Sequence, residues 1–162
     1  MIQFQDIDLQ TFLNEFWQKK PLVIRNALPD FIPPVSAEEL AGLSLEEEVE
    51  SRIVVQKSDT DYELKKGPFN EATYSDLPEK NWTLLIQGVD RLIPEVTDIL
   101  NDFDFLPRWR IDDIMISYAT QGGNVGPHFD HYDVFLLQAA GQRQWMLTSQ
   151  DCLEDNYIQG VD

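Results

Sequence analysis

Apolar residues recur at helical spacing near the amino terminus. This spacing predicts a first helix whose core-facing positions are Leu9, Phe12, Leu13, Phe16 and Trp17. Asp8 stands where a capping side chain is expected, and Pro21 should end the helix because it has no backbone N–H to donate. The short apolar run 22–24 follows and predicts a buried strand.

Two further helices are expected. Ser36 and Glu39 have the spacing of a capping box, which predicts a helix that continues to Leu43. Apolar residues at helical spacing predict another helix over 92–100. Short apolar or alternating runs predict strands at 52–56, 62–66, 82–87, 110–120, 134–138 and 144–147.

Many short strands separated by Gly and Pro turns favour a mainly β fold with flanking helices (α+β), in which the helices pack outside a jelly roll. We expect one domain over 1–162, with entry helices and strands over about 1–107 and a second group of strands over about 108–150. The last two predicted strands form a hairpin that turns near Gly141. We expect the four tryptophans to lie in the core: Trp17, Trp82, Trp109 and Trp145.

The composition is that of a folded, strongly acidic protein. Of 162 residues 43% are hydrophobic, and 12 Lys and Arg stand against 29 Asp and Glu, for a net charge of −17. This charge repels nucleic acids and anionic membranes and attracts basic partners, although a solvated acidic surface is the commoner explanation. Cys152 is the only cysteine, and neither a signal peptide nor a membrane-spanning run is seen. We therefore expect a cytoplasmic protein with no direct contact to nucleic acid or membrane.

A glycine-rich turn leads into the residues with the clearest potential for chemistry. It begins at Gly122 and reaches His128 and Asp130. In an extended segment these two side chains point to the same face, where they can supply an imidazole and a carboxylate to a metal. This ligand set, completed by a second His, is typical of non-haem Fe(II) oxygenases. Arg143 lies 13 residues after Asp130 (143 − 130), a distance that could return it to the same face.

Four segments together resemble the bacterial ribosomal oxygenases, which are cupin-like JmjC-type proteins. The segments are 16–25, 109–118, 126–135 and 141–145. The resemblance implies a double-stranded β-helix and an Fe(II)- and 2-oxoglutarate-dependent hydroxylase that acts on an arginine of a large-subunit ribosomal protein. It also implies that His128 and Asp130 bind Fe(II).

The resemblance further implies that Arg143 pairs with the far carboxylate of 2-oxoglutarate. Ser117 lies at the right depth to contact the cosubstrate, and Tyr118, Tyr132 and Asp133 are candidates for substrate binding. For Ser117 and Tyr118 structural packing is at least as good an explanation, and Arg143 could instead be an exposed strand residue. His131 should make only local hydrogen bonds.

The family's third metal ligand is a His on a later strand, but this chain contains only His128 and His131 and stops at Asp162. We therefore expect the N-terminal part of a longer protein, cut inside its jelly roll and inactive alone, with any homodimer formed through regions beyond it. Two alternatives stay open. One is a cupin metalloenzyme without 2-oxoglutarate, although Val134 and Phe135 stand where such proteins favour a Glu. The other is a non-catalytic protein-binding jelly roll.

Overall fold

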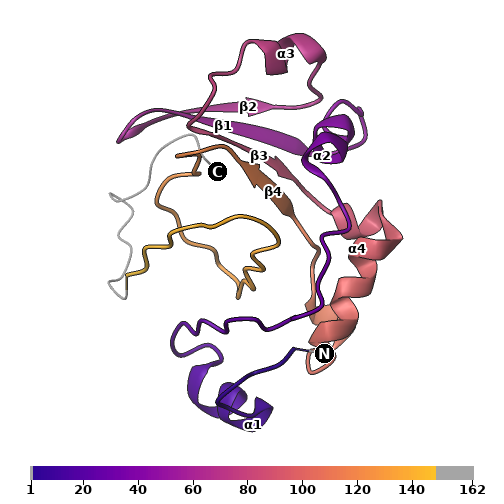
Figure 1. Ribbon diagram of the computed structural model, residues 1–162, viewed down its shortest axis with the longest axis vertical. Helices are drawn as coiled ribbons and strands as arrows, with labels where there is room; N and C mark the ends of the chain where they lie inside the picture. Colours follow the sequence, from indigo (N-terminus) through magenta and orange to yellow (C-terminus); the bar gives the residue numbers. More distant parts are fainter. Residues whose placement is uncertain (1, 149–162) are drawn as a thin grey trace.

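A four-stranded antiparallel sheet is the main element of the computed structural model, which describes residues 2–148, and it lies in the upper part of the view in Figure 1. The strand order is β2-β1-β3-β4. The strands are β1 (Ser51–Ser58), β2 (Asp61–Lys66), β3 (Trp82–Ile86) and β4 (Ile116–Ala119). The predicted fold of strands with flanking helices is confirmed, and β3, which begins at Trp82, lies inside the sheet between β1 and β4.

Helices and single turns surround this sheet. The α-helices are α1 (Leu9–Thr11), α2 (Ala37–Leu43), α3 (Glu71–Ser75) and α4 (Pro94–Ile99). A π-helical turn, η1 (Phe12–Phe16), continues α1, and the 3-10 turns are η2 (Val89–Arg91), η3 (Leu100–Phe103) and η4 (Arg108–Arg110). None of the helices in the described part has the length and apolarity of a membrane span.

Local sequence signals explain the helix starts. Asp8 accepts a hydrogen bond from the backbone N–H of Thr11, at 2.7 Å, and so caps α1 as predicted. The predicted capping box is also present, because the hydroxyl of Ser36 accepts from the Glu39 N–H and the Glu39 carboxylate accepts from the Ser36 N–H. The first helix ends at Phe16, earlier than the position that Pro21 suggested.

The two faces of the sheet differ. On one face β1 and β3 contribute Ile53, Val55, Leu84 and Ile86 to a core cluster that Leu40 and Val96 extend from the helices. The strand register places a second set of residues on the other face: Arg52, Val54, Gln56, Leu85 and Ser117. We call the face that carries this second set the inner face; it lies opposite the face that carries the core cluster. Figure 1 shows the segment after β4 turning back from the sheet toward α1.

Four strand predictions are wrong in whole or in part. Residues 22–24 are irregular, with Val23 74% exposed, so the apolar run is neither a strand nor buried. Of 110–120 only β4 is a strand. Before it, the Ile114 N–H donates to the Asp90 carboxylate and the Ile114 C=O accepts from the Val89 N–H. These backbone groups are therefore satisfied by a turn rather than by a ladder.

The predicted hairpin of 134–138 and 144–147 is also absent, because neither segment forms a strand. Gly141 adopts a positive φ of 69° within a bend at residues 140–141, near the position where the hairpin turn was expected. Trp109 and Trp145 are 83% and 47% exposed, which contradicts their assignment to the core. The end of the region predicted to extend to residue 150, together with Cys152, lies outside the described residues.

Candidate metal and cosubstrate site

His128 and Asp130 lie close together after the glycine-rich turn. The Nε2 atom of His128 is 3.9 Å from Oδ2 of Asp130, so the two side chains do face the same side. Ligand atoms that each sit about 2.1 Å from one metal ion can be at most about 4.2 Å apart. The observed spacing therefore allows both atoms to reach a shared ion.

The other ring nitrogen of His128 is already engaged. Nδ1 lies 3.0 Å from the backbone carbonyl oxygen of Gly126. Because a carbonyl can only accept, this hydrogen bond requires the proton on Nδ1 and leaves the lone pair of Nε2 free. Metal-binding histidines show the same arrangement, in which the second nitrogen donates to a carbonyl or carboxylate. In this tautomer Nε2 of His128 is the ring nitrogen whose lone pair is available to a metal.

His131 differs from its neighbour. Its ring packs edge-on against Phe129, with centroids 4.9 Å apart. Within residues 2–148, no group of three or more His, Cys, Asp and Glu is arranged to hold a metal. The described residues therefore provide two candidate ligands and not a complete set.

The remaining predicted site residues lie in β4 and in the irregular segment that follows Asp130. Arg143 is partly buried, and its guanidinium lies 5.6 Å from the ring centroid of Trp145. Ser117 lies on the inner face in β4. Tyr118 points to the opposite face and packs against Trp82, at 5.7 Å between centroids.

Tyr132 and Asp133 follow His128 and Asp130 in the chain. Tyr132 is 71% exposed. Asp133 accepts a hydrogen bond from the side chain of Gln18, at 2.8 Å, so one of its carboxylate oxygens has a structural partner. Sequence reasoning had no means of finding this partner, because the two residues lie 115 positions apart.

Asn124 was also missed. Its side-chain amide donates to Gln56 of β1 at 2.7 Å, and its Oδ1 accepts from the N–H of Gly126 at 2.9 Å. The only available sequence signal was its position inside the glycine-rich turn, where Asn is common for its side-chain hydrogen bonds to backbone.

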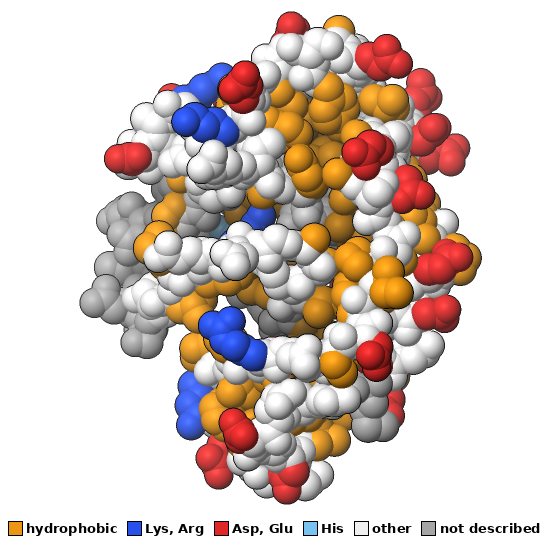
Figure 2. Space-filling view, in the orientation of Figure 1, with side chains coloured by type: hydrophobic (Ala, Val, Ile, Leu, Met, Phe, Trp, Pro, Cys, Tyr) orange, Lys and Arg blue, Asp and Glu red, His pale blue; other side chains and the backbone are white. Residues whose placement is uncertain are grey.

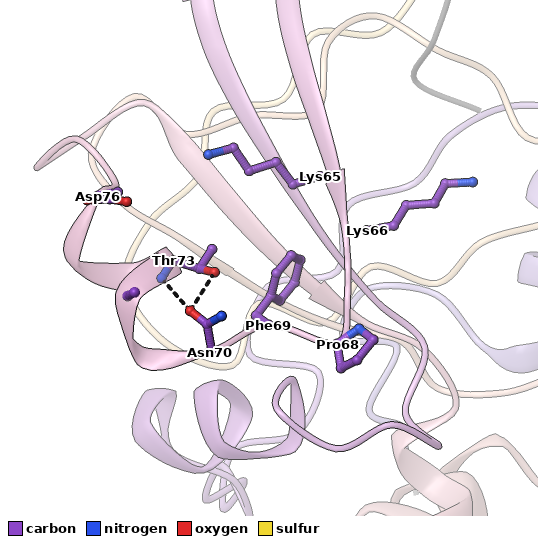
Figure 3. Close-up of a pocket in the computed structure, with 8 residues that line it drawn as sticks. Lys65, Lys66, Pro68, Phe69, Asn70, Thr73 and Asp76 are labelled. Atoms are coloured by element: carbon purple, nitrogen blue, oxygen red, sulfur yellow. Dashed lines mark hydrogen bonds between the residues drawn. The ribbon is translucent and has the colours of Figure 1, made fainter.

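An open hollow of about 440 Å³ lies elsewhere, between β2 and α3 (Figure 3). Lys65 and Lys66 border it, but none of the predicted site residues does. Asn70, which also lines it, uses its Oδ1 to accept from the N–H and the hydroxyl of Thr73 and so caps α3. The hollow is a surface depression formed by a helix start and is not the candidate site.

Comparison with known proteins shows which family this region of the chain is similar to. Residues 98–160 match the JmjC domain, a stretch that contains His128, Asp130 and Arg143. The chain is 43% identical over 143 residues to a probable ribosomal oxygenase of Haemophilus influenzae, and 46% identical over 134 residues to the ribosomal protein uL16 3-hydroxylase of Escherichia coli K12. The two matches include 88% and 83% of this chain, respectively, and 35% of the length of each relative.

The fold agrees with the sequence match. The structure of YcfD, a ribosomal oxygenase from Escherichia coli, in complex with cobalt and 2-oxoglutarate matches with a TM-score of 0.74 and 42% identity. The match covers 82% of this chain and 36% of that one. The resemblance to the JmjC-type ribosomal oxygenases that the sequence motifs indicated is therefore confirmed, and the chain spans about a third of the length of these relatives.

Proposed function

We propose that this chain supplies part of the active site of an Fe(II)- and 2-oxoglutarate-dependent hydroxylase that modifies an arginine of a large-subunit ribosomal protein. Two comparisons support this function. A relative bears the name ribosomal protein uL16 3-hydroxylase, and a similar solved structure contains cobalt and 2-oxoglutarate. The place of action would be the cytoplasm, where ribosomes work.

The observation that carries the proposal is the hydrogen bond that orients the His128 ring and leaves Nε2 facing Asp130. Its Nδ1 is held by the Gly126 carbonyl, and its Nε2 lies 3.9 Å from Asp130. In this proposal His128 and Asp130 hold the iron, while at least one further ligand comes from outside the described residues. When bound, Fe(II) and 2-oxoglutarate would activate dioxygen for insertion of a hydroxyl group.

Arg143 is proposed to bind the far carboxylate of 2-oxoglutarate. Its planar guanidinium can donate two parallel hydrogen bonds to a carboxylate. The stack on Trp145 limits its orientations, and partial burial reduces competition from water. The hydroxyl of Ser117, on the inner face, is proposed to donate a hydrogen bond to the same cosubstrate.

The acidic surface is proposed to attract the basic substrate protein. Figure 2 shows Asp and Glu side chains spread over the visible face with fewer Lys and Arg, in line with the net charge of −17. Tyr132, which is well exposed, and Asp133 would contact the substrate arginine. Asp133 would do so through Oδ1, because Oδ2 accepts from Gln18. Tyr118 has the weakest support, because it packs against Trp82 on the opposite face.

The test is Fe(II)-dependent turnover of 2-oxoglutarate by the protein that carries this sequence, with uL16 as the substrate. His128→Ala should abolish turnover, whereas the matched control His131→Ala should retain most of it, because the His131 ring packs against Phe129 and does not form a three-residue metal-holding group with His128 and Asp130. Arg143→Lys keeps the positive charge but loses the planar guanidinium that donates two parallel hydrogen bonds. The KM for 2-oxoglutarate should therefore rise roughly tenfold or more.

Turnover that survives His128→Ala would refute the role of His128 as an iron ligand, and absence of turnover in the unsubstituted protein would refute the oxygenase proposal. Absence of turnover in the unsubstituted protein, combined with uL16 binding that His128→Ala leaves intact, would instead support the alternative of a non-catalytic binding module.

A further inference from the structure

We propose that Asn124 is a positioning residue that fixes the orientation and tautomer of His128 by anchoring the glycine-rich turn to β1. This inference rests on the proposed function, because it concerns how a metal ligand is prepared. Asn124 contacts neither the metal pair nor any substrate group. It acts through the backbone of Gly126, which lies between it and the imidazole.

Asn124 uses both ends of its side-chain amide. Nδ2 donates to Oε1 of Gln56 at 2.7 Å and to the carbonyl of Gly122 at 3.1 Å. Oδ1 accepts from the N–H of Gly126 at 2.9 Å. The last contact is an Asx turn, in which a side-chain oxygen bonds to the backbone two residues further on. One amide thus joins the sheet to the turn.

The peptide unit of Gly126 transmits this anchoring to the imidazole. The N–H of Gly126 bonds to Asn124, and its C=O accepts from Nδ1 of His128 at 3.0 Å. Gly126 has a positive φ of 77°, a conformation that residues with a Cβ rarely adopt. If the turn changed shape, the carbonyl would move and the hydrogen bond that fixes the ring would weaken.

The backbone before Asn124 is held just as firmly. The N–H of Gly123 donates to the Thr120 carbonyl at 2.8 Å, and the N–H of Thr120 donates to the Trp82 carbonyl at 3.1 Å. A Cβ on Gly123 would lie 2.2 Å from that same Trp82 oxygen, which shows how closely the turn crosses β3. The turn therefore has a fixed start on β3 and a second anchor on β1.

Gln56 is itself fixed. Its Nε2 donates to the phenol oxygen of Tyr62 on the neighbouring strand β2, at 3.3 Å, so its Oε1 is oriented toward Asn124. A connected series of hydrogen bonds therefore runs from β2 through β1 and Asn124 to His128. Residues of this kind, which orient a ligand without touching the metal, typically change metal affinity 10- to 100-fold when they are removed.

The experiment reads the imidazole directly. Long-range ¹H–¹⁵N NMR of the ¹⁵N-labelled chain at pH about 8, where an ordinary histidine is neutral, shows which ring nitrogen carries the proton. We expect Nδ1–H at His128, with His131 as the internal comparison. Asn124→Ala should shift His128 toward the Nε2–H tautomer. The backbone ¹H–¹⁵N spectrum of each variant verifies that the sheet stays folded.

Two substitutions of Gln56, which lies 68 residues before Asn124 in the chain, test the hydrogen bond between these two side chains. Gln56→Ala removes the acceptor for Asn124 and should shift the His128 tautomer in the same direction as Asn124→Ala. Gln56→Glu still places a side-chain oxygen at this position as the acceptor for Asn124 and should keep the His128 tautomer. Gln121→Ala, an exposed side chain in the same loop, should have no effect.

A second readout uses Mn²⁺ alone as the probe. The Mn²⁺ concentration that half-broadens the His128 signals should rise about tenfold or more in Asn124→Ala and in Gln56→Ala, but not in Gln56→Glu.

Retention of Nδ1–H at His128 in both alanine variants would overturn the positioning role, as would an Nε2–H tautomer in the unsubstituted chain. If the tautomer shifts as expected but Mn²⁺ broadens no signal in any variant, the positioning role holds and the proposed metal site fails.

Discussion

The side-chain amide of Gln18 donates a 2.8 Å hydrogen bond to Oδ2 of Asp133 and so joins the end of the first helix to the segment after His128 and Asp130. Two positions further on, the ring of Phe135 stacks on Trp17, with centroids 5.5 Å apart and planes inclined by 18°. The amino-terminal helix therefore holds the segment that follows Asp130 by a polar and an apolar contact.

A double-mutant cycle should detect the polar contact. We expect Gln18→Ala and Asp133→Ala to couple by about 0.5–1 kcal/mol in the free energy of unfolding, because an exposed hydrogen bond contributes little net stability. Urea denaturation of the two single variants and the double variant measures this energy. Gln10→Ala, at an exposed position of α1, should be additive with Asp133→Ala. Full additivity of the Gln18 pair would contradict the contact.

Phe12 should contribute most to the apolar contact. It is 6% exposed, and its ring lies 5.1–6.4 Å from those of Phe4, Trp17, Phe105 and Phe135. Phe12→Ala should cost about 3–5 kcal/mol, because it leaves a cavity among these rings. Val23→Ala, at a 74% exposed position, should change stability by less than about 0.5 kcal/mol. Equal effects of the two substitutions in chemical denaturation would show that the cluster does not form.

Elements whose signals are local could be predicted from the sequence. The capping box at Ser36 and Glu39 satisfies its own backbone groups within one turn, so the start of α2 was found. The strand from Trp82 was found because continuous burial on both faces leaves a continuous apolar run. The side-by-side placement of His128 and Asp130 was found because alternation along an extended chain decides it.

Elements that depend on distant partners could not be predicted. The strand expected over 110–120 fails before residue 116 because Asp90, more than twenty positions away, accepts the N–H of Ile114. The run 134–138 lacks a paired strand, and Phe135 packs instead on Trp17 and Phe12. The role of Asn124 could not be predicted for the same reason, because its hydrogen-bond partner Gln56 is 68 residues away.

Two glycines should respond in opposite ways to alanine. At Gly123 the new Cβ would lie 2.2 Å from the Trp82 carbonyl oxygen, so the turn would have to move off β3 and stability should fall. At Gly42, within α2, nothing lies within 4 Å, and alanine should raise stability by about 0.5–1 kcal/mol through helix propensity. Thermal unfolding of both variants measures the effects. A Gly123→Ala protein as stable as Gly42→Ala would refute the close crossing.

The capping box should also make stability depend on pH. Hydrogen bonds from the backbone and side chain of Ser36 lower the pKa of Glu39 below the ordinary value of 4.5. Because the folded-state pKa is depressed, the stabilisation is fully present above about pH 4.5 and is lost as the pH falls through the lowered value. Glu39→Gln can still accept from the Ser36 N–H but cannot titrate, so part of the fall in melting temperature between about pH 5 and pH 3 should disappear.

Glu38→Gln, one position earlier in the same helical turn, is the matched control for this change and should keep the full acid sensitivity. The measurement is the melting temperature of α-helical circular dichroism at a series of pH values. Identical pH profiles for the two variants would show that the Glu39 carboxylate is not bound by the helix start in solution, whatever the stability of α2 at neutral pH.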